Sequence, residues 1–283
     1  MSPTVELPAW LEAFRPDDGL YADAYENTPA PLRALLKTAI AFAFHRWEGK
    51  DAERSARVRS PRAGFLRKES SRPAAWVLAH VGEGFASPAR FLAALVPAVL
   101  AGAERIIVIS PAPFAPAVAT ALELSGLEDS FVLDETQTAD LYEDLRAASP
   151  DGRVVVFPGT EEALRAGQKD LMHKAASDGI PLYRDRPAPS LLSLYEDTDG
   201  PHPEHPSAGE TAGRLLWLHP DAKLLSAPSP DVDAVFLPDE GVALPCPAPL
   251  VAGPGMEACW MGPSPEFFRT RTLAAFLIQE NQS

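Results

Sequence analysis

The middle of the chain alternates between short apolar runs and longer stretches in which apolar residues recur at helical spacing. Three runs, 75–80, 105–110 and 154–157, are apolar almost throughout and are bounded by turn residues. Runs of this length with such flanks are typical of buried strands. Because their apolar residues do not alternate with polar ones, they are predicted to lie in a sheet that is covered on both faces.

The connections between these strands carry helix start and stop signals. Ser87 is suited to cap a helix whose first turn holds Pro88 and which Gly102 ends. Further helices are predicted over 114–125, 136–148 and 161–176, and further strands over 131–133 and 181–183. Strand and helix thus alternate four times with short connections. This order predicts an α/β fold with a doubly wound, mostly parallel sheet and helices on both faces.

The regions that flank this core have different patterns. We expect residues 1–74 to form an N-terminal helical arm, residues 75–200 the nucleotide-binding-type core, and residues 201–283 a loop-rich C-terminal part that completes the fold. Most of the thirty prolines fall late in the chain, which favours loops there. The elements predicted in the flanks are a helix over 31–44, strands over 214–219 and 232–237, and a helix over 265–279. That last helix is amphipathic and is expected to pack on the core or on a second subunit.

The formal net charge of −14 makes nucleic acid and anionic membranes unfavourable general partners. One basic segment departs from this balance and contains Arg54, Arg57, Arg59, Arg62, Arg67, Lys68 and Arg72. It is interpreted either as a solvated charged loop or as a site for a phosphate-bearing ligand or an acidic subunit.

The chain shows no secretory start, no apolar run of about 18 residues and only two cysteines, Cys246 and Cys259. These features predict a cytoplasmic protein without a membrane span or a disulfide framework.

Two strand-to-helix turns are the candidate binding residues. Gly82 and Gly84 follow the first core strand and precede Ser87, whereas Pro158, Gly159 and Thr160 follow the strand over 154–157. Ligands of open parallel sheets bind at the carboxyl ends of the strands, where helix starts offer N–H groups to anions. We therefore expect the two turns to share a crevice suited to an anion. The alternative is that both are plain connections with ordinary caps.

A second candidate is a loop that places His202 and His205 on either side of Glu204. Two imidazoles and a carboxylate suit zinc or another transition metal. The neighbouring prolines preclude a regular helix through all three residues, and no third ligand is marked in the sequence. The loop is therefore a weak metal candidate, and solvated histidines are the alternative.

The order of several motifs resembles histidinol dehydrogenase, whose domains are related in fold to aldehyde dehydrogenases. Residues 87–109 are similar to the helix that ends in PA-x-x-AG before a strand. Residues 124–141 parallel the segment with GGAQA, and 154–160 (VVVFPGT) parallel IVGPGN. Residues 179–192, 234–238 and 251–255 parallel GID…AGPSEVLV, AIFLG and AGPNH in the same order.

The resemblance implies NAD or NADP as cofactor, with Gln137 and Thr160 in the positions of the dinucleotide contacts. It also implies a zinc ion and a Glu-His pair that acts as base. The chain departs from both implications: Met256 stands where AGPNH has histidine, and no Glu-His pair precedes residue 234. The chain also stops at Ser283, before the family's C-terminal domain. We therefore expect a shortened, degenerate relative that binds no metal.

Two functional hypotheses follow. The first is a histidinol dehydrogenase-like protein that binds NAD or NADP while its zinc-dependent apparatus is lost or altered. If active, it would be an oxidoreductase of alcohols or aldehydes, and no catalytic residue is assigned. The second is a non-catalytic scaffold or regulatory homo-oligomer with a vestigial dinucleotide cleft. Neither hypothesis involves nucleic acid or a membrane.

Overall fold

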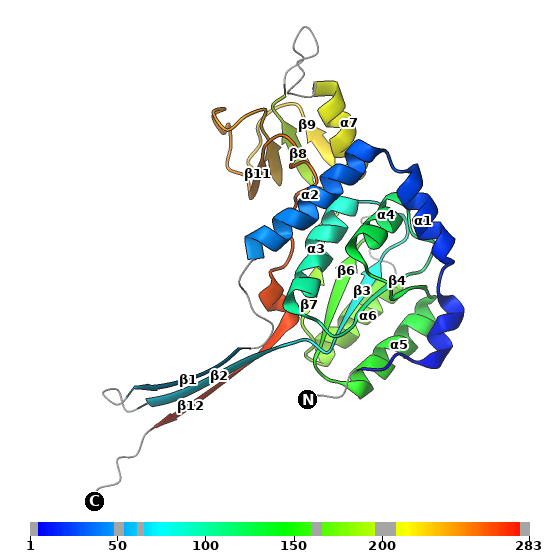
Figure 1. Cartoon of the computed structure of the whole chain (residues 1–283), viewed down its shortest axis with the longest axis vertical. Helices are drawn as coiled ribbons and strands as arrows, with labels where there is room; N and C mark the ends of the chain where they lie inside the picture. Colours follow the sequence, from blue (N-terminus) through cyan, green and yellow to red (C-terminus); the bar gives the residue numbers. More distant parts are fainter. Residues whose placement is uncertain (1–4, 48–53, 61–64, 160–165, 196–207, 278–283) are drawn as a thin grey trace, which may run out of the picture.

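The computed structural model describes residues 5–47, 54–60, 65–159, 166–195 and 208–277. Its centre is a parallel sheet of five strands in the order β5-β4-β3-β6-β7 (Figure 1). The strands are β3 (Trp76–Val81), β4 (Ile106–Ser110), β5 (Ser130–Val132), β6 (Gly152–Phe157) and β7 (Leu182–Arg184). The chain starts in the middle of the sheet, winds to one edge and then returns to the other. The predicted doubly wound α/β fold is therefore confirmed.

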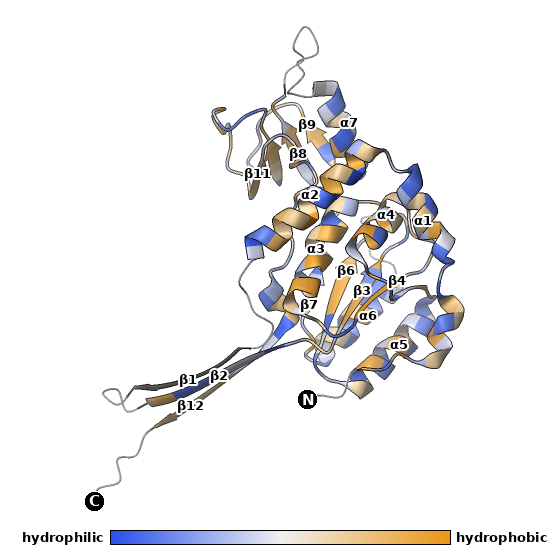
Figure 2. Cartoon of the chain, in the orientation of Figure 1, coloured by the Kyte–Doolittle hydropathy of each residue, from blue (hydrophilic) through white to orange (hydrophobic). Residues whose placement is uncertain are grey.

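Helices cover both faces of this sheet. Helices α3 (Pro88–Ala101) and α4 (Pro116–Ser125) lie on one face, whereas α5 (Glu135–Ala148) and α6 (Ala166–Ser177) lie on the other. Strand β3 shows why its sequence is apolar throughout: Val77 and Ala79 pack toward the first pair of helices, and Trp76 and Leu78 toward the second. The strongly apolar residues accordingly lie in the core strands and on α3 (Figure 2).

The local signals of α3 act as predicted. The Ser87 hydroxyl accepts the Arg90 N–H at the start of the helix, and Pro88 stands in the first turn. Gly102 ends the helix at φ 74°, a left-handed conformation that glycine adopts without steric cost.

A smaller parallel sheet lies beside the core, in the order β11-β10-β8-β9 (Figure 1). Its strands are β8 (Ser190–Ser193), β9 (Lys223–Leu225), β10 (Ala234–Phe236) and β11 (Leu250–Ala252), and α7 (Ala208–Leu218) packs on it. The strand predicted over 214–219 is wrong, because these residues belong to α7 and the loop after it. Thr211, Leu215 and Leu218 are fully buried and share one helical face, whereas Leu216 between them is exposed.

The N-terminal region begins with the helices η1 (Ala9–Phe14), α1 (Asp18–Asn27) and α2 (Ala30–Trp47). Helix α1 packs on α4, and α2 on α3. The expectation of a helical arm over residues 1–74 is corrected after this point, because β1 (Arg54–Ser60) and β2 (Phe65–Pro73) are antiparallel strands. The basic segment thus lies mostly in a β-hairpin rather than in a loop.

The helix predicted over 265–279 is also wrong. A 3₁₀ turn, η2 (Pro265–Phe268), leads into β12 (Arg269–Leu277), and all nine residues of that strand pair with β2. This pairing satisfies the backbone polar groups at a position where a helix would have no core to cover. The sheet β1-β2-β12 extends away from the body of the molecule as a long arm (Figure 1). Within the described part of the chain, no helix has both the length and the apolar character needed to cross a membrane.

Candidate functional site

The two predicted turns meet at the carboxyl edge of the core sheet. The Gly82 N–H donates to the Phe157 carbonyl at 2.8 Å. A Cβ atom on Gly82 would lie 2.5 Å from the Gly159 nitrogen, and one on Gly159 would lie 2.2 Å from the Glu83 carbonyl oxygen. Only glycine allows this contact. Pro158 is buried next to it, whereas Gly84 is exposed and turns the chain at φ 79°.

A cavity of about 180 Å³ opens beside the touching turns. It lies where β3, β4 and β5 end, between the beginnings of α5 and α6. Its wall is formed by His80, Gly82, Glu83, Pro111, Leu133, Asp134, Glu135, Thr138, Gly167 and Gln168. This is the crevice at the carboxyl ends of parallel strands in which ligands of open α/β sheets bind.

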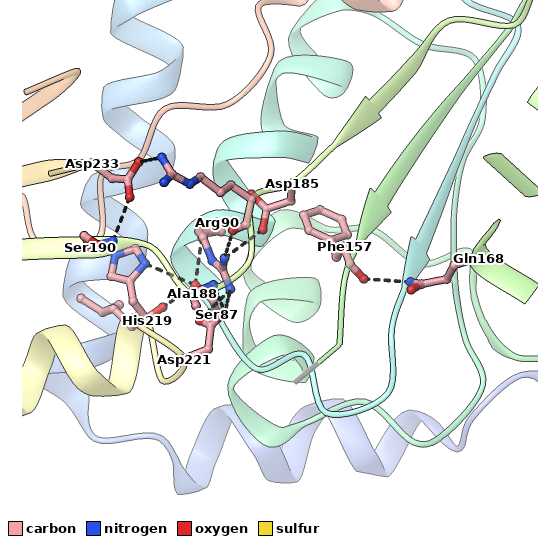
Figure 3. Close-up of polar contacts among 12 residues, drawn as sticks. Ser87, Arg90, Phe157, Gln168, Asp185, Ala188, Ser190, His219, Asp221 and Asp233 are labelled. Atoms are coloured by element: carbon pink, nitrogen blue, oxygen red, sulfur yellow. Dashed lines mark hydrogen bonds and ion pairs between the residues drawn. The ribbon is translucent and has the colours of Figure 1, made fainter. Parts of the chain in front are cut away.

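His80 and Gln168 form a buried pair in this wall. The Gln168 amide nitrogen donates to the Phe157 carbonyl at 3.0 Å and lies 3.1 Å from Nδ1 of His80 (Figure 3 shows the Gln168–Phe157 bond). Burial lowers the pKa of His80 to about 4, so the ring is neutral at neutral pH. Since Nδ1 accepts from Gln168, the ring hydrogen is assigned to Nε2.

Thr138, one turn into α5, also lines the cavity. Its hydroxyl oxygen is buried and has no hydrogen-bond partner in the structure. Burying a hydroxyl without a hydrogen-bond partner costs folding free energy.

The start of α5 uses its polar side chains for capping. Asp134 accepts the Gln137 N–H at 2.8 Å, and the Gln137 side chain accepts the Asp134 N–H at 2.9 Å. Glu135 reaches across to α6 and accepts the Gly167 N–H at 3.0 Å. The Gln137 amide oxygen is therefore engaged in a helix cap, and its role as a cofactor contact stays a prediction.

Ser87 lies in a different environment from the other predicted residues. Its hydroxyl is fully buried and donates to the Leu218 carbonyl at 2.6 Å, under the end of α7. His219 follows at once and is also fully buried, and burial lowers its pKa to about 3, with Arg90 acting in the same direction. The start of α3 is therefore covered by the smaller sheet's helix.

Sequence reasoning missed a buried ionic network around Arg90 (Figure 3). Arg90 donates to both carboxylate oxygens of Asp221, at 2.7 and 2.6 Å, and pairs with Asp185 at 3.2 Å. Burial raises the pKa of Asp185 to about 6, against the opposing effect of Arg90. The signal available in the sequence was an arginine on the apolar face of α3, at a position where a hydrophobic residue is expected.

Carboxylates of this region also bind the chain segment 186–190, which connects the two sheets. Asp221 accepts the Ala188 N–H at 3.0 Å, and Asp233 accepts the Ser190 N–H at 2.8 Å and pairs with Arg186. Ala188 adopts φ 47°, which is rare for a residue with a side chain. The carboxylates therefore fix the crossing chain in a strained conformation.

Thr160, His202 and His205 lie outside the described residues. Elsewhere in the described part of the chain, no group of three or more His, Cys, Asp or Glu side chains is placed to hold a metal ion. The described residues therefore do not fit the zinc that the resemblance implies.

Comparison with known proteins supports the fold. No protein-family model and no curated protein matches the sequence at a significant level. Among solved structures, histidinol dehydrogenase from Elizabethkingia anophelis is 12% identical, has a TM-score of 0.54, and is matched over 93% of this chain and 77% of that one. Succinate-semialdehyde dehydrogenase from Burkholderia pseudomallei has 17% identity, a TM-score of 0.40, and coverage of 78% and 45%.

An NAD-dependent benzaldehyde dehydrogenase from Corynebacterium glutamicum has 11% identity, a TM-score of 0.35, and coverage of 78% and 55%. The chain spans about half the length of these two aldehyde dehydrogenases. Of these three structures, only histidinol dehydrogenase has a TM-score above 0.5. The chain therefore has the fold of histidinol dehydrogenase, in agreement with the order of its sequence motifs.

Proposed function

We propose that this protein binds a nucleotide of the NAD class at the carboxyl edge of its core sheet and is dehydrogenase-like, with the zinc-dependent chemistry of histidinol dehydrogenase lost or altered. The observation that carries the proposal is the cavity beside the Gly82 and Gly159 turns, with carboxylates on its wall. When bound, NAD supplies a hydride acceptor.

The charges around the cavity favour a nucleotide with free ribose hydroxyls. Glu83, Asp134 and Glu135 line it, and carboxylates accept hydrogen bonds from ribose hydroxyls but repel a 2′-phosphate. We therefore propose NAD rather than NADP.

Calorimetric titration of the full chain with NAD and with NADP tests this proposal. NAD is expected to bind at least tenfold more tightly than NADP, which corresponds to about 1.4 kcal/mol. Millimolar concentrations of either nucleotide that give neither heat nor a thermal shift would remove the proposal.

The variant Glu135→Gln tests the role of charge. Glutamine keeps a side-chain oxygen for the Gly167 N–H but loses the negative charge. The preference for NAD over NADP should fall several-fold, chiefly through tighter NADP binding, because repulsion of the 2′-phosphate is weaker. The matched control is Glu123→Gln on α4, away from the cavity, which should leave both affinities unchanged. An unaltered preference in Glu135→Gln would contradict the electrostatic argument.

The second candidate function is that of a homo-oligomeric scaffold, and the arm favours it. Phe65, Leu273 and Leu277 are 51%, 63% and 75% exposed, and strand register places all three on one face of the arm. Exposed apolar patches of this kind are typical of protein interfaces. Light scattering should then report a dimer or higher oligomer. A strict monomer at high protein concentration would exclude this candidate.

A further inference from the structure

We infer that the far end of the β1-β2-β12 arm docks on the surface of an anionic phospholipid membrane. Its apolar side chains enter the boundary between headgroups and acyl chains, and its cations lie among the phosphates. The far end is the part of the arm most distant from the core. Strand β2 ends next to Ala74, whose N–H donates to the Phe268 carbonyl of the core, and β12 begins directly after Phe268 (Figure 1). The inference does not depend on nucleotide binding.

The first observation is that the far end is apolar on both faces. Phe65 pairs with Leu277 across β2 and β12, and in the next row Leu66 pairs with Phe276. Successive side chains of a strand point to opposite faces, so each face carries one of these pairs. Phe65 and Phe276 are each 51% exposed, and apolar residues gather at this end of both strands (Figure 2). A protein partner seated on one face would leave the other pair in water, whereas insertion of the end into a membrane buries both pairs.

The second observation is that cations follow directly behind the apolar rows. Arg67 and Lys68 come next in β2 and, as neighbours in a strand, lie on opposite faces. The Lys68 ammonium lies over the Phe276 ring, 5.7 Å from its centroid. Arg67 pairs with Glu69 at 3.3 Å, but both side chains are exposed, and a surface pair of this kind is weak enough to exchange for a lipid phosphate. Basic side chains beside apolar ones are typical of membrane interfaces, where the charge stays at headgroup level.

The third observation is the separation of charge between the arm and the rest of the chain. The three strands contain eight of the 25 lysines and arginines but one of the 39 acidic residues. The eight cations are Arg54, Arg57, Arg59, Arg67, Lys68, Arg72, Arg269 and Arg271. Strands β2 and β12 are nine residues long, or about 30 Å, whereas charges in physiological salt are screened within about 8–10 Å. The acidic balance of the whole chain therefore does not act at the far end. An anionic surface attracts the arm and repels the body, which sets the orientation of docking.

The depth of insertion follows from the same strands. The two apolar rows extend about 7 Å along the arm, which matches the roughly 5–10 Å to which amphipathic elements enter the headgroup–acyl boundary. Strand β12 lies at the edge of the described sheet, and an open sheet edge is not tolerated in the hydrocarbon core. The arm is therefore a peripheral anchor and does not span the bilayer.

Cosedimentation of the full chain with phospholipid vesicles tests this inference. The chain should bind vesicles that mix phosphatidylserine with phosphatidylcholine. Binding to phosphatidylcholine alone should be about tenfold weaker or less, and binding to the mixed vesicles should fall as NaCl is raised, because salt screens the cations.

Two variants with matched controls locate the docking surface. Phe276→Ser should weaken binding to the mixed vesicles about tenfold, because an aromatic ring no longer leaves water. Its control is Phe44→Ser on α2, which removes a phenylalanine of similar exposure, 48%, from the body and should leave binding unchanged. Lys68→Gln should weaken binding about fivefold, whereas Lys169→Gln on α6 should have no effect.

The possible results separate the membrane from other partners. No binding to the mixed vesicles, equal binding to both kinds of vesicle, or normal binding by both Phe276→Ser and Lys68→Gln would overturn the inference. If vesicles do not bind but sedimentation velocity reveals an oligomer that Phe276→Ser dissociates, the partner of the far end is a second copy of the chain instead. Unchanged circular dichroism and melting temperature show that the variants are folded, as expected for substitutions of exposed side chains.

Discussion

At the scale of single residues, two glycines decide how the carboxyl edge of the core sheet is built. Gly82 and Gly159 let two turns touch backbone to backbone, and the cavity opens beside this contact. We predict that Gly159→Ala destabilises the protein by about 1–3 kcal/mol, because the new methyl group would overlap the Glu83 carbonyl oxygen. Urea denaturation measures the loss. The control is Gly209→Ala in α7, where a Cβ meets no atom within 4 Å; it should be neutral or stabilising. Equal stabilities of the two variants would contradict the close contact.

At the scale of elements, β12 is the strand whose exposed side chains could form an interface with a second copy of the chain. Its residues alternate between the two faces of the arm, and Leu273 shares a face with Phe65 and Leu277. We predict that Leu273→Arg shifts an oligomer to the monomer, because a charge would replace an exposed apolar side chain on the face that also carries Phe65 and Leu277. The matched control is Thr272→Arg, which adds the same charge on the opposite face and should preserve the oligomer. Sedimentation velocity distinguishes the two, and an oligomer that survives Leu273→Arg would place the interface elsewhere.

At the scale of the whole molecule, buried ionisable groups make stability depend on pH. His80 and His219 have folded-state pKa values of about 4 and about 3, below the unfolded value near 6.5. The unfolded chain therefore binds more protons as the pH falls below 6.5, and stability falls with it. Asp185 acts in the opposite direction, because its folded pKa of about 6 lies above the unfolded value of 3.8, so acid stabilises its folded form between these values.

The two histidines outweigh the single aspartate in this range. Between pH 7 and pH 5 we expect each histidine to contribute a loss of about 2 kcal/mol, which Asp185 offsets in part. Urea denaturation at both values measures the change. The variant His219→Gln should reduce the slope, because it removes one of the two buried histidines. Stability that is constant or higher at pH 5 would show that the histidines are not buried in neutral form.

Local sequence signals were sufficient to predict the strands and turns of the core sheet. The uniformly apolar runs became β3, β4 and β6, Ser87 and Gly102 bound α3, and Gly82 and Gly159 meet where the parallel order required. These features depend on near neighbours in the chain: a strand buried on both faces needs apolar residues at every position, and a cap needs a hydroxyl next to its own helix.

The remaining features depend on contacts between distant segments. The residues of β12 are strand because β2 offers an open edge, although their apolar spacing also suits a helix. Arg90 is tolerated inside α3 because Asp185 and Asp221, about 100 residues away or more, neutralise it. The cavity likewise exists only in the folded chain, because its wall comes from α5, α6 and the ends of three strands. In that wall the Thr138 hydroxyl is buried without a hydrogen-bond partner. Periodicity and capping are properties of neighbouring residues and can be recognised in a sequence, whereas charge pairing, burial of a single hydroxyl and strand partnership exist only after the chain has folded.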